Sequence, residues 1–341
     1  MPLLRKKTEP TATPLDGVDV VLADLDGVVY TGSRAIPHAI DALNRAAASV
    51  RIGYITNNAS RTDAVVAKHL SDLGLSVAPD EVVTSPQAAM RVLGQQAEPG
   101  SVVLVVGGDG LIDELQKAGY RPTTSALDDP AAVVQGFAPD IAWTQLAEAA
   151  YALQGESGKD LPWIATNTDW TIPQERGIAP GNGTLVSAVH SAVGRLPLVA
   201  GKPEVPIFDE ARARFGARNP VFIGDRLDTD ILGANRAGIT AIHVLTGVDR
   251  AKHVLAAPAD SRPRYILEDL RGLHEPYPET TFSRKRDTAT VRDSVVRLSG
   301  TSVEIVHDGD SRIDLLRAAC AVIWESGMAI HVLDVPERLY A

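Results

Sequence analysis

Two aspartates, Asp24 and Asp26, directly follow the apolar run VVLA and lead into Gly27. This run, from Val20 to Ala23, is typical of a strand that is buried on both faces of a parallel sheet. Open α/β sheets bind ligands beyond the carboxyl ends of their strands, which is where the pair would lie. Two carboxylates so close together repel each other unless a cation or a shared proton compensates. The pair therefore indicates a metal site, or two carboxyl groups with separate acid and base duties, although a solvated Asp-Gly turn would use the same residues.

Three further apolar runs end in polar residues of complementary chemistry. The first ends in Thr56-Asn57-Asn58, the second in Gly201-Lys202, and the third in Gly224-Asp225 followed by Asp228 and Asp230. Asp24, Asp26 and Asp225 offer the hard oxygen ligands that Mg2+ prefers. Thr56 and the backbone N–H groups after it suit phosphate oxygens, and Lys202 supplies a positive charge for a phosphoryl group. Together the four strand ends predict a phosphate-handling site with a divalent metal.

The sequences DLDGVVY, ITNNASRT, GKPEVPIF and GDRLDTDILGANRAG resemble the four motifs of the haloacid-dehalogenase-like phosphatases. The resemblance covers about residues 16–275. Within that family the chain is most similar to the IIA branch, which includes phosphatases acting on p-nitrophenyl phosphate, pyridoxal phosphate, phosphoglycolate and glycerol phosphate.

This resemblance implies roles for individual residues. Asp24 would attack phosphorus to give an aspartyl-phosphate, and Asp26 would protonate the leaving alkoxide and later activate a water. Thr56 and Lys202 would hold the phosphoryl oxygens. Asp225 would bind Mg2+ together with the Asp24 carboxylate and the Asp26 backbone carbonyl, and Asp230 would orient the acidic loop. A dehalogenase needs neither the acid nor the metal, so the presence of both Asp26 and Asp225 favours a phosphatase.

Alternating strand and helix patterns predict an α/β fold: a Rossmann-like parallel-sheet core with an inserted α/β cap domain and a small C-terminal α+β extension. The run Leu196 to Ala200 is expected to be a strand that returns the chain to the core. The extension is expected to have the element order ββαβ, with its last strand near Ile330 to Leu333. The expected parts are a flexible tail over 1–15, the core over 16–85 and 195–275, the cap over 86–194, a linker over 276–287 and the extension over 288–341.

A cap domain recognises the leaving group of the substrate, and the best candidates for contact with that group are in the segments TNTD and APGNG. Asn167, Asp169 and Asn182 offer hydrogen bonds without a cation, which favours a polyol over a carboxylate. The nearest cation, Arg176, could reverse that preference if it reached the site. The segment GGDGLID, Gly107 to Asp113, lacks the third glycine of a dinucleotide fingerprint and is expected to be an ordinary turn between strand and helix.

Composition narrows the class of protein. The 341 residues carry a net charge of −10 and a 45% apolar share, which argues against nucleic-acid and anionic-membrane partners. The basic start MPLLRKKTEP has no apolar stretch after it and is not expected to be a secretory signal. The single cysteine, Cys320, lies on an apolar helix face and fits a reduced, cytoplasmic location.

The resulting hypothesis is a cytoplasmic, Mg2+-dependent phosphatase of a small phosphate monoester, with glycerol 3-phosphate favoured and phosphoglycolate or pyridoxal phosphate as alternatives. A phosphomutase would need a site for a second phosphate, which the cap sequence does not indicate. A non-catalytic phosphate- or nucleotide-binding regulator is the rival from another class, and both a monomer and a homo-oligomer stay open.

Overall fold

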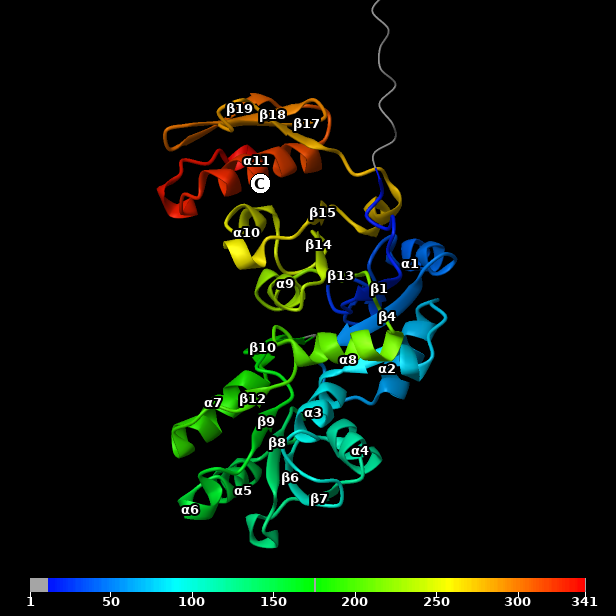
Figure 1. The fold of residues 1–341 in the computed structure, drawn as a ribbon, viewed down its shortest axis with the longest axis vertical. Coiled ribbons are helices and arrows are strands. Elements are labelled where there is room, and N and C mark those ends of the chain that lie inside the picture. Colours follow the sequence, from blue (N-terminus) through cyan, green and yellow to red (C-terminus); the bar gives the residue numbers. More distant parts are fainter. Residues whose placement is uncertain (1–11, 175, 341) are drawn as a thin grey trace, which may run out of the picture.

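The computed structural model describes residues 12–174 and 176–340. Its central element is a six-stranded parallel sheet with the order β15-β14-β13-β1-β4-β5 (Figure 1). The strands are β1 (Val20–Ala23), β4 (Arg51–Thr56), β5 (Val82–Thr84), β13 (Pro220–Gly224), β14 (Thr240–Val244) and β15 (Tyr265–Leu267). Its helices are α1 (Ala39–Ala47), α2 (Asp63–Asp72), α3 (Ser85–Leu93), α8 (Pro206–Phe215), α9 (Leu232–Arg236) and α10 (Ala251–Leu255).

Strand β1 is covered on both faces, as its apolar sequence predicts. Val20 and Leu22 belong to one buried cluster, which includes residues of α3, α8 and α9, whereas Val21 and Ala23 belong to another, which includes residues of α1 and α2. All four side chains are buried. Because β1 lies between β13 and β4, its carboxyl end is flanked by the ends of two other motif-bearing strands.

The inserted cap contains a second parallel sheet, with the order β12-β9-β8-β6-β7, and lies below the core in Figure 1. The strands are β6 (Val102–Val106), β7 (Arg121–Thr123), β8 (Ala132–Gln135), β9 (Trp163–Ala165) and β12 (Leu198–Val199). The cap helices are α4 (Asp109–Lys117), α5 (Trp143–Ala152), α6 (Gly155–Gly158) and α7 (Asn182–Val193), and β10 (Thr171–Gln174) pairs with β11 (Gly177–Pro180) as a hairpin.

One boundary of the expected core was wrong. The run from Leu196 to Ala200 was expected in the core sheet, but β12 pairs in parallel with β9 of the cap sheet. A short apolar strand fits the edge of either sheet, so its amino-acid sequence does not show which sheet it joins. The turn between Gly107 and Asp113 begins helix α4, as expected, and Gly110 sits close to the backbone of Arg61 in the core, where a side chain would be crowded.

The C-terminal module, residues 276–340, differs from the expected ββαβ order. It is a four-stranded antiparallel sheet, β16-β17-β18-β19, followed by one long helix. Its elements are β16 (Thr280–Phe282), β17 (Thr288–Val291), β18 (Ser294–Ser299), β19 (Ser302–His307) and α11 (Arg312–Ser326). Strand β16 thus lies in the expected linker, and the expected last strand is a 3-10 turn, Ile330–Val332. The Ser311 hydroxyl caps α11 by accepting a hydrogen bond from the Asp314 N–H.

The start of the chain was expected to be a flexible tail over 1–15. Residues 1–11 lie outside the described residues, but residues 12–15 pack on the core. The Ala12 carbonyl accepts a hydrogen bond from the Tyr277 N–H at 3.1 Å, and Leu15 packs against the apolar cluster under β1. Over 12–174 and 176–340, none of the helices combines the length and apolar character that a membrane crossing requires.

Candidate active site

Three of the four predicted strand ends meet at one edge of the core sheet, and the fourth, which carries Lys202, reaches that edge from the cap sheet. Asp24 follows β1, Thr56 ends β4, and Asp225 follows β13, while Lys202 enters from β12 of the cap. The Lys202 Nζ lies 2.6 Å from Asp24 Oδ1 and 2.6 Å from Asp230 Oδ1. All five of these side chains are buried. Asp24 and Lys202, which are 178 positions apart in the chain, are thus direct partners in one buried polar cluster.

The charges in this cluster depend on one another. Burial alone would lower the pKa of Lys202, but Asp230 and Asp24 outweigh burial and hold that pKa above its ordinary value. Lys202 is therefore a cation. Burial raises the pKa of Asp24, and the Lys202 ammonium opposes the rise. A divalent cation would oppose it further and favour the carboxylate form that a nucleophile needs.

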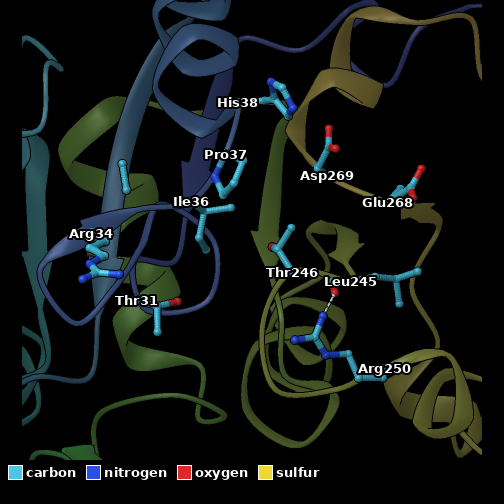
Figure 2. Close-up of a pocket in the computed structure, with 11 residues that line it drawn as sticks. Thr31, Arg34, Ile36, Pro37, His38, Leu245, Thr246, Arg250, Glu268 and Asp269 are labelled. Atoms are coloured by element: carbon cyan, nitrogen blue, oxygen red, sulfur yellow. Dashed lines mark hydrogen bonds between the residues drawn. The ribbon is translucent and has the colours of Figure 1, made fainter. Parts of the chain in front are cut away.

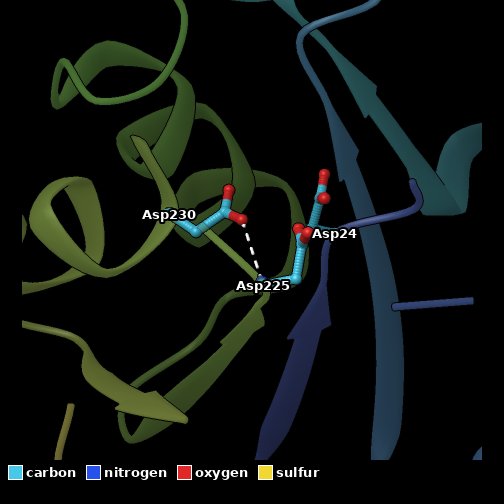
Figure 3. A group of neighbouring side chains, drawn as sticks. All are labelled: Asp24, Asp225 and Asp230. Atoms are coloured by element: carbon cyan, nitrogen blue, oxygen red, sulfur yellow. Dashed lines mark hydrogen bonds between the residues drawn. The ribbon is translucent and has the colours of Figure 1, made fainter. Parts of the chain in front are cut away.

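Asp24, Asp225 and Asp230 provide carboxylate oxygens that all lie within 4.8 Å of one another (Figure 3). Both Asp230 oxygens are engaged, because Oδ1 binds Lys202 and Oδ2 accepts the N–H groups of Asp225 and Arg226 at 3.1 Å each. By contrast, Asp225 Oδ1 is buried and has no hydrogen-bond partner among the described residues. An orphaned buried carboxylate oxygen beside a second carboxylate is the donor set that Mg2+ fits.

Asp225 is closely enclosed. Its Oδ2 accepts the Val248 N–H at 2.6 Å, and burial together with Asp230 raises the pKa of Asp225 to about 7. A Cβ on Gly27 would lie 2.3 Å from Asp225 Oδ2, and a Cβ on Gly247 would lie 1.8 Å from it. Gly27 also has a φ of +83°, which L side chains rarely adopt. The glycine after Asp26 is thus required by the close approach of Asp225.

Asp26 differs from Asp24 in its surroundings. Its side chain is exposed, whereas Asp24 is buried. Desolvation by the surrounding protein nevertheless raises the pKa of Asp26, while Lys202 and Arg61 oppose the rise. A carboxyl group with a raised pKa is more often protonated and can serve as a proton donor. The two aspartates of one motif therefore suit different chemical roles.

The amide side chains of Asn57 and Asn58 have partners within the protein. Asn57 Oδ1 accepts the Lys202 N–H at 2.9 Å, and its Nδ2 donates to the Lys202 carbonyl at 3.0 Å. Asn58 Oδ1 accepts the N–H groups of Ser60 and Arg61 and so shapes the turn before α2. The Asn58 N–H in turn donates to Thr56 Oγ1 at 3.1 Å. Asn57 thus holds Lys202 in place, and the contact of Thr56, Asn57 and Asn58 with a phosphate stays a prediction.

The three expected substrate-reading residues of the cap fall into two kinds. Asn167 Nδ2 donates to the Asn57 carbonyl at 2.8 Å, and Asn182 Nδ2 donates to the Asn167 carbonyl at 2.7 Å. Both asparagines are buried, and each donates one N–H to a backbone carbonyl where cap meets core, so their contact with the substrate stays a prediction. Asp169 instead presents its carboxylate to the core, accepting Asn57 Nδ2 at 3.1 and 3.3 Å.

A cation that sequence reasoning missed lies near Asp169. Burial would lower the pKa of Arg226, but its fork-like pair with Asp228 at 3.1 and 3.0 Å, and the charges of Asp169 and Asp230, raise that pKa above its usual range. The position of Arg226 between the acidic residues Asp225 and Asp228 was the sequence feature that could have indicated this cation. Arg176, the cation considered earlier, lies exposed in the turn of the β10–β11 hairpin.

Fold and site together define a haloacid-dehalogenase-like hydrolase, and the chain belongs to this family. The family model described as haloacid dehalogenase-like hydrolase matches residues 21–121, and a second model of HAD-hydrolase-like proteins matches residues 199–273. The chain is 39% identical over 319 residues to a D-glycerol 3-phosphate phosphatase of Mycobacterium tuberculosis, covering 91% of this chain and 87% of that protein. It is 38% identical to a glycerol-3-phosphate phosphatase of Gallus gallus, covering 73% of this chain and 86% of that protein.

Solved structures show the same likeness. A crystal structure of glycerol phosphate phosphatase from Mycobacterium tuberculosis in complex with magnesium superposes with a TM-score of 0.84 at 37% identity, covering 95% of each chain. The p-nitrophenyl phosphatase from Archaeoglobus fulgidus superposes with a TM-score of 0.68 at 27% identity, covering 98% of that chain but 75% of this one. About a quarter of this chain thus lies outside the likeness to the smaller phosphatase.

Proposed function

We propose that the protein is a Mg2+-dependent phosphatase that hydrolyses a small phosphate monoester, with glycerol 3-phosphate as its preferred substrate. The observation that carries the proposal is the buried Lys202–Asp24 pair, 2.6 Å apart, beside Asp225 with its orphaned oxygen. The relatives named above, which are called glycerol phosphate phosphatases, support the substrate class. A cytoplasmic location is part of the proposal, because the single cysteine, Cys320, is buried and unpaired.

In this mechanism Asp24 and Asp26 act in sequence. The Asp24 carboxylate attacks phosphorus, and the bond to the leaving oxygen breaks as Asp26 donates its proton to that oxygen. Asp26, now a carboxylate, then takes a proton from a water that attacks the aspartyl-phosphate, which releases phosphate and restores Asp24. General acid help of this kind contributes about 10²–10⁴-fold for a poor alkoxide leaving group.

The other residues of the cluster hold charges in place. Lys202 balances the negative charge of the phosphoryl group, and Asn57 fixes the Lys202 backbone. Asp24, Asp225 and the Asp26 carbonyl would hold Mg2+, and Asp230 would keep Lys202 and the acidic loop in place. When bound, Mg2+ supplies positive charge that offsets the repulsion between an anionic nucleophile and a phosphate dianion.

Substrate choice is argued from Asp169. Its carboxylate faces the core site, so the carboxylate of phosphoglycolate would meet a like charge in a space that excludes water, whereas the hydroxyls of a glycerol phosphate could donate to it. We therefore expect a higher kcat/KM for glycerol 3-phosphate than for phosphoglycolate or pyridoxal phosphate. Asp169→Asn should narrow the difference. A preference for phosphoglycolate that is lost in Arg176→Ala would instead show that the hairpin cation reads the substrate.

The function is tested by phosphate release from a panel of these esters with Mg2+ or with a chelator. Asp24→Asn should lower turnover by at least about 10³-fold, because an amide is not a nucleophile for phosphorus. Asp228→Asn is the matched control: Asp228 lies in the acidic loop, 67% of its side chain is exposed, and it pairs with Arg226, so the rate should stay near that of the parent. Full activity in chelator would contradict the metal site, and no turnover of any ester would favour the binding regulator.

A further inference from the structure

The segment 246–249, which follows β14, packs closely against Asp225. Val248 N–H donates to Asp225 Oδ2 at 2.6 Å, and Asp249 N–H donates to the Asp225 carbonyl at 3.1 Å. Thr246 Oγ1 donates to the Gly27 carbonyl at 2.7 Å, which ties the segment to the loop after β1. The segment thus touches both loops that carry the expected metal ligands.

The Asp249 carboxylate completes the support of the turn that carries Asp225. Its Oδ2 accepts the Leu227 N–H at 2.6 Å, at the start of the helical turn η3 (Leu227–Ile231). Asp230 Oδ2 accepts the two preceding N–H groups, those of Asp225 and Arg226. Three successive backbone amides are therefore held by two carboxylates, and only 18% of the Asp249 side chain is exposed.

We propose that Asp249 is a positioning residue: by holding Leu227, it fixes the direction in which the free oxygen of Asp225 points and so sets the affinity for Mg2+. This inference rests on the proposed function, since it assigns Asp225 to a metal. Groups that orient a metal ligand typically account for 10- to 100-fold in metal affinity. Val248 fixes one oxygen of Asp225, and the backbone turn held by Asp249 sets where the other oxygen lies.

The far side of the segment offers little support that could replace Asp249. A cavity of about 710 Å³ separates it from the hairpin of β2 (Tyr30–Thr31) and β3 (Arg34–Ala35). Figure 2 shows Leu245, Thr246 and Arg250 on one side of this cavity and Arg34 on the other. On the core side, the segment is held by the hydrogen bonds of Thr246, Val248 and Asp249 described above.

The charge of Asp249 is not needed for this role. Its Oδ1 lies 3.4 Å from His253 Nδ1, but that nitrogen accepts the Arg250 N–H at 3.0 Å, so it carries no proton to share with Asp249. An asparagine could accept the Leu227 N–H with its side-chain oxygen in place of the carboxylate. Asp249→Asn is therefore a conservative variant, whereas Asp249→Ala removes the acceptor.

The test is the dissociation constant for Mg2+, measured from the Mg2+-dependent rise in Tm of the full-length protein and, separately, from activity against Mg2+ concentration. Asp249→Ala should weaken Mg2+ binding about tenfold or more, with kcat at saturating Mg2+ near that of the parent, and Asp249→Asn should restore the affinity. Asp269→Ala is the matched control, because Asp269 also follows a core strand, accepts a backbone N–H (that of Arg271, at 2.9 Å) and has a 12% exposed side chain. It should lower Tm without changing Mg2+ affinity.

The outcomes separate this inference from the proposed function. If the parent shows no Mg2+-dependent rise in Tm, the metal-dependent function is overturned together with the inference. If the parent binds Mg2+ and Asp249→Ala binds it equally well, or Asp269→Ala weakens binding as much, only the role of Asp249 is overturned. Should Asp249→Ala be insoluble, Asp249→Glu replaces it. That variant keeps the charge but displaces the acceptor by one methylene, so unchanged Mg2+ affinity there would also overturn the role.

Discussion

At the scale of residues, the site depends on giving two aspartates of one short motif different environments. Burial raises the pKa of Asp24, but the Lys202 ammonium at 2.6 Å opposes the rise and supports the anion that can attack. Asp26 is exposed, has no such partner in the described part of the chain, and has a raised pKa, which favours a proton donor. Environments that separate the duties of neighbouring carboxyl groups are a common basis for acid and base assignments.

Asp26→Asn tests this separation. Hydrolysis of glycerol 3-phosphate should slow by about 10²–10⁴-fold, because its alkoxide leaves poorly without a proton. Hydrolysis of p-nitrophenyl phosphate should slow much less at the leaving-group step, since nitrophenolate needs little protonation. Single-turnover rates of aspartyl-phosphate formation with both esters provide the measurement. Equal losses on the two esters would remove Asp26 from the acid role.

At the scale of elements, β14 supplies the segment 246–249 and also carries a buried histidine. His243 is fully buried, its Nε2 lies 3.1 Å from the Asp249 carbonyl, and its Nδ1 has no partner within the described ranges. Burial lowers the pKa of His243, because a charged imidazole would lose its hydration there. Asp249 opposes this shift. The strand is therefore built around a neutral histidine.

This burial predicts a pH dependence of stability. With a folded pKa below the ordinary 6.5, the unfolded chain binds the proton more tightly, so His243 makes the protein less stable as the pH falls below about 6.5. The slope approaches about 1.4 kcal/mol per pH unit between the unfolded and folded pKa values. Between pH 7.5 and 5.5, Tm should therefore fall further in the parent than in His243→Gln, which cannot titrate. Parallel Tm profiles for the two proteins would contradict a buried neutral His243.

At the scale of the whole molecule, the C-terminal module covers the edge of the core sheet that ends in β15. Val254 and Leu255 of α10 and Ile266 of β15 belong to the same buried cluster as the inner face of the module. The Arg317 side chain of α11 donates to the Ile266 carbonyl at 3.0 and 2.6 Å, and to Asp314 Oδ1 at 2.6 Å. The module thus satisfies a backbone group of an edge strand that would otherwise face solvent or another chain.

Arg317→Ala should therefore destabilise the whole protein. We expect a loss of about 2–3 kcal/mol in the free energy of unfolding, because the largely buried Asp314 and the Ile266 carbonyl each lose a charged donor while Arg292 remains with Asp314. Arg338→Ala is the control within the same module, since its pair with Asp308 is about half exposed and should contribute less than about 1 kcal/mol. Denaturant unfolding measures both variants, and equal small losses would show that Arg317 does not anchor the module.

Local patterns of residues were enough to predict the fold class and the chemistry at the edge of the core sheet. Runs such as Val20 to Ala23 are typical of strands buried on two faces, and polar residues that follow parallel strands of one sheet lie at one edge of that sheet. The apolar face that carries Cys320 was likewise predicted as core, and the thiol is buried. These features follow from local periodicity, which a single chain displays without any knowledge of its long-range contacts.

The partner of each polar group, by contrast, depends on contacts between segments that are distant in the chain. The letters of Leu198-Val199 suit either sheet, and pairing with β9 placed them in the cap. Asn167 and Asn182 have the chemistry of substrate readers, but backbone carbonyls at the junction of cap and core take their amides. Asp249 gives no signal in sequence, since its role depends on an N–H group 22 residues away. Hydrogen bonds between distant segments are set by tertiary packing, which the local pattern of residues does not specify.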